Sequence, residues 1–178
     1  MTKYILLAFS TLIAVACNNT TTSNNNNNAT DTTADTSLAA QPAANSALDV
    51  QPLSNYFVKN NIKISDSLTF WVIDNQTSFD SLFGVAKTMT NEIVTPDFGT
   101  HVVIAATMPA TAYNTQIQLL SATNDNDNNA EMHFVAVGAE KQSSTITPVW
   151  LGLLPKTGLK TVKLYTGDQL SKAVTPPQ

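Results

Sequence analysis

The chain has 178 residues, of which 43% are hydrophobic, and carries a formal net charge of −4 with nine lysines and no arginine. Nucleic-acid binding needs a clustered basic face, and these scattered lysines, opposed by thirteen carboxylates, do not supply one. The single cysteine excludes an internal disulfide and a cysteine-based metal cage.

The first segment has the pattern of an export signal. Lys3 precedes a mostly apolar run over residues 4–16. This run is too short for a membrane-spanning helix, which needs roughly 20 residues, but it fits the roughly 7–15 apolar residues of a cleaved signal peptide. The run ends in Ala14-Val15-Ala16-Cys17, which resembles the lipobox of bacterial lipoproteins. The resemblance implies cleavage after residue 16 and acylation of the Cys17 thiol.

We therefore expect a lipid-anchored protein of the bacterial cell envelope, attached to a membrane through Cys17. The sequence leaves open whether the chain lies on the periplasmic or the surface side. The alternative is an ordinary secretory signal with a coincidental cysteine, but the only cysteine lies directly after the apolar run. Loss of residues 1–16 would remove Lys3 and change the net charge to −5.

A composition change follows Cys17. Residues 18–46 are rich in Asn, Thr, Ser, Ala and Asp, and Leu38 is their only large apolar residue. Such a segment cannot bury enough surface to offset its ordering entropy. We expect residues 17–48 to form a flexible tether with an end-to-end distance of about 30 Å. A single folded domain is expected over residues 49–178.

The first patterns within this domain are a short strand and a short helix. Residues 68–73 are rich in aromatic and β-branched side chains, as strands are. Phe79, Leu82 and Phe83 then follow the i, i+3, i+4 spacing of one helical face. This predicts a helix of about two turns over residues 77–83, with Thr77 or Asn75 as its N-cap.

The rest of the domain has strand patterns. An apolar run at 101–106, bounded by turn signals, is typical of a strand buried on both faces. Residues 113–121 and 132–137 alternate and flank a loop rich in Asn and Asp, which predicts a hairpin. Two more strands are expected at 144–154 and 160–165. This spacing predicts a mainly β fold, either an antiparallel immunoglobulin-like sandwich or an open barrel with one short helix.

The domain carries no catalytic sequence motif. It contains no Gly-x-Ser-x-Gly elbow, no His-Glu-x-x-His pair and no glycine-rich phosphate loop. His101 and His133 lie on predicted strands far apart in the sequence, and such histidines are usually packed or surface side chains. We therefore expect neither enzymatic activity nor a cofactor.

One spacing has the form of a cation site. Asp125, Asp127, Asn129 and Glu131 occupy every second position, so their oxygens could converge on Ca²⁺. A calcium loop of twelve residues needs Gly at its sixth position and Glu at its twelfth, and this chain has alanine at both. Turn chemistry alone also favours Asn and Asp here. We therefore expect a polar hairpin loop, with a calcium site as the alternative.

Short motifs follow one another over residues 68–165. They are Phe-x-x-Leu-Phe at 79–83, Asp-Phe at 97–98, Pro-x-x-x-Tyr at 109–113, Gln142 and a Thr-Pro pair at 147–148. Their order resembles that of PrcB-type lipoproteins, named for a regulator of a surface protease complex, although that family prefers Gly where this chain has Ala112. The resemblance implies a non-catalytic domain that binds or regulates an envelope protein, a protease in the family's case.

Two of these segments are also similar to inhibitory loops of chagasin-type cysteine protease inhibitors, which are immunoglobulin-like sandwiches. The resemblances make six residues candidates for partner binding: Pro109, Ala110, Thr111, Tyr113, Pro148 and Trp150. Burial in the core is the alternative for the two aromatic side chains. A second hypothesis is a small-ligand or glycan-binding accessory lipoprotein that uses Trp71, Tyr113 or Trp150 on an exposed sheet face.

The anchoring hypothesis predicts the behaviour of a Cys17→Ser variant. Without the thiol that accepts lipid, the protein should leave the membrane fraction or accumulate as an uncleaved precursor. Fractionation followed by immunoblotting measures both outcomes. Mature, membrane-bound Cys17→Ser protein would contradict the hypothesis.

Overall fold

The computed structural model describes residues 45–177. The expected signal peptide, Cys17 and most of the expected tether lie outside these residues. The described part is mainly β with one short helix, as the sequence predicts. In residues 45–177, no helix has the length and apolar character needed to cross a membrane.

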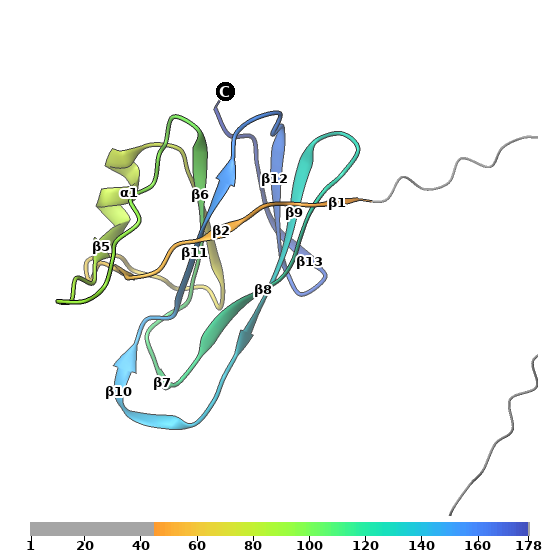
Figure 1. Cartoon of the computed structure of the whole chain (residues 1–178). Helices are drawn as coiled ribbons and strands as arrows, with labels where there is room; N and C mark the ends of the chain where they lie inside the picture. Colours follow the sequence, from red (N-terminus) through yellow and green to blue (C-terminus); the bar gives the residue numbers. More distant parts are fainter. Residues whose placement is uncertain (1–44, 178) are drawn as a thin grey trace, which may run out of the picture. The chain divides into compact units, whose positions relative to one another are not determined.

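Two open sheets face each other as a sandwich (Figure 1). The five-stranded sheet has the order β1 (Ser46–Ala47), β8 (Gln116–Asn124), β9 (Asn129–Val137), β12 (Thr161–Thr166) and β13 (Gln169–Val174). The four-stranded sheet has the order β2 (Gln51–Pro52), β11 (Val149–Pro155), β6 (His101–Thr107) and β4 (Thr69–Ile73). Two small ribbons complete the fold: β3 (Tyr56–Val58) with β5 (Phe83–Val85), and β7 (Thr111–Tyr113) with β10 (Lys141–Ile146).

One strand pair departs from the expected antiparallel arrangement. β9 and β12 are parallel, whereas every other strand pair in residues 45–177 is antiparallel. After β9 the chain forms β10 and then β11, which belongs to the opposite sheet. The chain then crosses back to the five-stranded sheet as β12, which pairs with β9 and runs in the same direction.

Strand β6 is buried on both faces, as its apolar run predicts. Val102, Ile104 and Ala106 contact the core between the two sheets, and Val103 and Ala105 contact a second core on the other face. None of these five side chains is exposed to solvent. The alternation of a strand thus supplies two hydrophobic cores at once.

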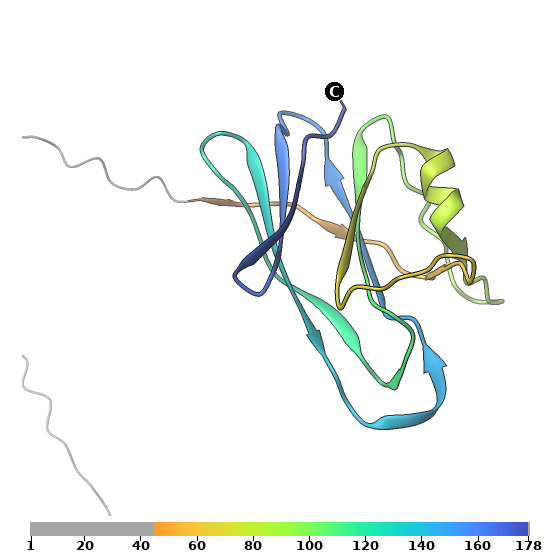
Figure 2. The same ribbon diagram turned by 180° about the vertical axis from the view of Figure 1, so that it is seen from behind.

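Helix α1 (Gln76–Leu82) covers the outer face of the four-stranded sheet, opposite the five-stranded sheet (Figure 2). Asn75 is the N-cap, and its side-chain oxygen accepts the backbone N–H of Ser78 at 2.8 Å. Phe79 is 2% exposed and packs edge-on against Tyr56, with ring centroids 5.1 Å apart. The expected helix is confirmed, and its cap is Asn75 rather than Thr77.

The strands differ from the expected ones in several places, and the short strands β2, β3 and β5 were not expected. β1 and Leu48, whose N–H donates to the carbonyl of Ala122, lie within the segment expected to be a tether. The strand expected at 144–154 is two strands, β10 and β11, which separate at Pro148 because proline has no N–H for a ladder. The exposed edge strand β13 was not expected, since its polar residues carry no core-facing alternation.

Close packing at Gly152 gives a stability prediction. A Cβ at this position would lie 2.6 Å from the ring of Trp150 and 2.9 Å from Val50. Because Phe134 holds the Trp150 ring, Gly152→Ala should lower the free energy of unfolding by about 1–3 kcal/mol, as overpacked cores do. Gly138→Ala is the control, since its Cβ would have no neighbour closer than 3.9 Å. Urea unfolding of the full-length chain measures both, and equal stability of the two variants would contradict the packing.

Candidate functional site

The structure brings the two candidate partner-binding segments together. In the ribbon of β7 and β10, Thr111 pairs with Ile146 and Tyr113 pairs with Lys141. Just before the ribbon, the N–H of Met108 donates to the carbonyl of Pro148 at 3.1 Å. The expected turn at 109–113 is therefore partly a strand, and the ribbon lies at the lower end of the domain in Figure 1.

The six candidate residues differ in accessibility. Ala110 and Tyr113 are exposed, the latter to 52%, while Pro109 and Thr111 are half-buried. The other two candidates, Pro148 and Trp150, are not free surface residues. Pro148 is buried, and the half-buried Trp150 packs against the core between the sheets, with its ring edge-on to Phe134. Residues 109–113 are thus accessible to a partner, whereas the Pro148–Trp150 motif belongs mainly to the packing of the fold.

A groove with a volume of about 590 Å³ lies beside the ribbon. It is lined by Pro109 and Ala110, by Thr145 and Thr147, and by a third segment comprising Val58, Lys59, Asn60, Ile62, Lys63 and Ile64. Sequence reasoning missed this third segment, which lies about fifty residues before the ribbon and carries no motif. Among the residues that the structure describes, its two lysines are the only charged side chains in the lining.

The glycan hypothesis needs exposed aromatic side chains gathered on a sheet face. Trp71 packs against the second core, and its indole N–H donates to the hydroxyl of Thr107 at 3.1 Å. Trp150 packs against the first core. Of the three aromatic residues considered for this function, only Tyr113 is exposed, so they form no such platform.

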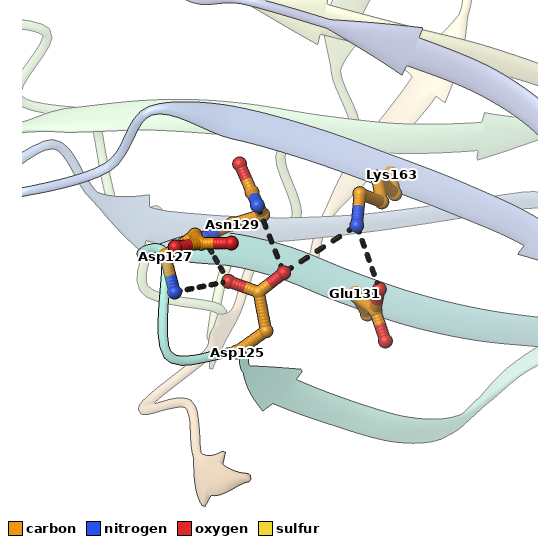
Figure 3. A network of polar contacts seen from close by, with 5 residues as sticks. All are labelled: Asp125, Asp127, Asn129, Glu131 and Lys163. Atoms are coloured by element: carbon orange, nitrogen blue, oxygen red, sulfur yellow. Dashed lines mark hydrogen bonds and ion pairs between the residues drawn. The ribbon is translucent and has the colours of Figure 1, made fainter.

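The four residues of the candidate calcium loop form a polar network closed by a lysine (Figure 3). Asp125 accepts the backbone N–H of Asp127 at 2.9 Å, and the backbone and side-chain N–H groups of Asn129, both at 2.8 Å. Lys163, from β12, lies 3.4 Å from the Asp125 carboxylate and 2.9 Å from that of Glu131. These bonds, those from Asn129 above all, lower the pKa of Asp125 to about 2.

The Lys163 ammonium therefore bridges Asp125 and Glu131, two of the three carboxylates of the candidate calcium loop. Hydrogen bonds to Glu131 and Asp125 raise the pKa of this lysine, which keeps its charge in place. In the part of the chain that the structure describes, no three His, Cys, Asp or Glu side chains are grouped to hold a metal ion. The network fastens the hairpin of β8 and β9 to β12.

A second polar cluster precedes β6. Asp97 accepts the N–H of Gly99 at 2.9 Å, and the hydroxyl of Thr100 lies 2.8 Å from the Asp97 carboxylate and 2.7 Å from Nδ1 of His101. The Thr100 hydrogen bond, followed by that of Gly99, lowers the pKa of Asp97. In a nucleophilic triad the imidazole lies between hydroxyl and carboxylate, whereas here the hydroxyl is in the middle. The geometry is that of a turn that starts the buried strand.

The lowered pKa of Asp125 predicts an acid-dependent loss of stability. Its contribution should be complete above about pH 4, the ordinary range of an aspartate, and should disappear as the pH falls towards 2. Asp125→Asn should therefore be less stable than the parent chain at pH 7, with a smaller difference near pH 2. Asp66→Asn, at an exposed position, is the control. Urea unfolding across this pH range measures the effect, and identical profiles for the parent chain and Asp125→Asn would rule it out.

No protein-family model, curated protein or solved structure matches the chain. The resemblance to PrcB-type lipoproteins, drawn from the order of short motifs, therefore stays a prediction.

Proposed function

We propose that this chain is a lipid-anchored protein of the bacterial envelope whose β domain binds another envelope protein, a protease, without catalysing a reaction itself. The observation that carries the proposal is the meeting of residues 109–113 and 145–148 at one end of the sandwich, beside a groove. The lipobox-like sequence at Cys17 supports the anchor, and the order of motifs similar to PrcB-type lipoproteins supports a protease as partner.

The ribbon has the rigidity that recognition requires. Backbone hydrogen bonds hold the chain on either end of β7 to the segment that contains β10. The N–H of Met108 donates to the carbonyl of Pro148 at 3.1 Å, and the N–H of Asn114 donates to the carbonyl of Glu140 at 3.0 Å. The N–H of Ala139 donates back to the carbonyl of Asn114 at 3.1 Å. A surface that is already ordered loses little conformational entropy when it binds. Loops held on a rigid scaffold commonly carry binding function.

The chemistry of the ribbon suits binding better than catalysis. Its accessible side chains are those of Ala110 and Tyr113, together with the polar residues of β10, which are exposed from Lys141 to Thr145. In residues 45–177, none of these groups is paired with a histidine or a carboxylate that would activate it. A tyrosine with one apolar face and one polar end is, by contrast, a frequent anchor in protein interfaces.

A charge placed on the ribbon tests the proposal. Ala110→Asp should leave the melting temperature of the full-length chain nearly unchanged, because the side chain is exposed, and should weaken capture of the partner from envelope extract. Ala110 is a better position than Thr111, whose hydroxyl accepts the N–H of Tyr113 at 3.2 Å.

Ala173→Asp is the matched control, because it introduces the same charge at an exposed position on β13. Capture followed by quantitative mass spectrometry should show a partner lost with Ala110→Asp and retained with Ala173→Asp. If an Ala110→Asp protein that melts normally retains every partner, the ribbon is not the binding surface.

A further inference from the structure

We infer that the groove beside the ribbon binds an extended, acidic segment of a partner protein, with Lys63 as its main charged contact. This inference rests on the proposed function, because it specifies which part of a protein partner the ribbon end would receive. The groove is lined by Lys59 and Lys63, by Ala110, which directly precedes β7, and by Thr145 on β10.

The charge of the groove is opposite to that of the chain. The chain has a net charge of −4, yet among residues 45–177 no Asp or Glu lines the groove and two lysines do. Within residues 45–177, neither lysine lies within ion-pair distance of a carboxylate. Lys59 contacts Asp80 only through its backbone carbonyl, and the Asp80 carboxylate accepts a hydrogen bond from the side chain of Gln76. A local positive site on an acidic protein favours carboxylates of the partner.

The two lysines differ in their freedom to reach a ligand. Lys59 is half-buried and its ammonium donates to the backbone carbonyl of Asp80, so its position is fixed. Lys63 is exposed and makes no hydrogen bond or ion pair in the part of the chain that the structure describes. The free ammonium of Lys63 can therefore approach a carboxylate without breaking an existing contact.

The remaining lining suits an extended chain. Val58, Ile62 and Ile64 supply apolar surface, and the hydroxyl groups of Thr145 and Thr147 supply hydrogen-bonding groups. Within the described part of the chain, β10 has a single hydrogen-bonded neighbour, β7, so the strand that ends at the groove has one backbone edge without a neighbouring strand there. Extended peptides bind to such edges through their main chain, while adjacent pockets accept their side chains. A volume of about 590 Å³ accommodates a short peptide stretch rather than a folded domain.

A defined peptide pair tests this inference directly. The probe is a fluorescein-labelled peptide of alternating Ser and Glu, and its control is the same peptide with Gln in place of Glu. Fluorescence anisotropy with the full-length chain in detergent should give tighter binding of the Ser-Glu peptide, by about fivefold or more at low salt. High salt should reduce this difference, because exposed charges are screened.

Lys63→Glu should remove this preference for the acidic peptide. Lys160→Glu makes the same charge change at an exposed position outside the groove lining and should leave the preference within about twofold. Equal binding of the two peptides, or an equal loss with both variants, would overturn the inference. Displacement of the peptide by an equal concentration of free glutarate would also overturn it, since the groove would then select a small carboxylate.

These results separate the inference from the proposed function. If Ala110→Asp abolishes partner capture while Lys63→Glu affects neither capture nor peptide binding, the ribbon binds a partner but the groove does not receive an acidic segment. If Ala110→Asp retains every partner while the Ser-Glu peptide binds through Lys63, the ribbon proposal fails, and only the selection of an acidic peptide by the groove stands.

Discussion

The burial of β6 on both faces is the constraint on which the rest of the structure depends. The five-stranded sheet covers one face of β6, and α1 covers the other face together with the ribbon of β3 and β5. β6 also positions the candidate site, because its last residue, Thr107, pairs with Val149, the first residue of β11. Residues 109–113 and 145–148 thus leave the same end of one buried strand pair. The pairing of β6 with β11 in the core therefore already brings these two segments close together.

The sequence predicted the elements whose burial leaves a pattern in their residues. The unbroken apolar run at 101–106 marked a strand buried on both faces, and the periods of the helix around Phe79 and of the β8 and β9 hairpin marked elements with one buried face. The edge strands β1 and β13 were not expected, since they are mostly exposed and carry no such period. The parallel pairing of β9 with β12 depends on a crossover between sheets, which local patterns do not encode.

The candidate site was predicted less completely, for a related reason. Pro109 to Tyr113 could be singled out as a motif, but Lys59 and Lys63 reach the groove through tertiary folding alone. Likewise, the cation that neutralises Asp125 is Lys163, 38 residues away, so the loop resembled a metal site in sequence. Trp150 resembled a binding residue because core and interface use the same large aromatic side chains.

Site-specific photocrosslinking in intact cells tests the central claim, that the ribbon end is a protein-binding surface, most directly. A benzophenone amino acid at position 110 of the full-length chain would lie in the groove lining directly before β7, and the same residue at position 173 would lie on β13. We expect a discrete crosslinked envelope protein from position 110 and none from position 173. Crosslinks of equal yield and identity from both positions, or none from position 110 at normal expression, would contradict it.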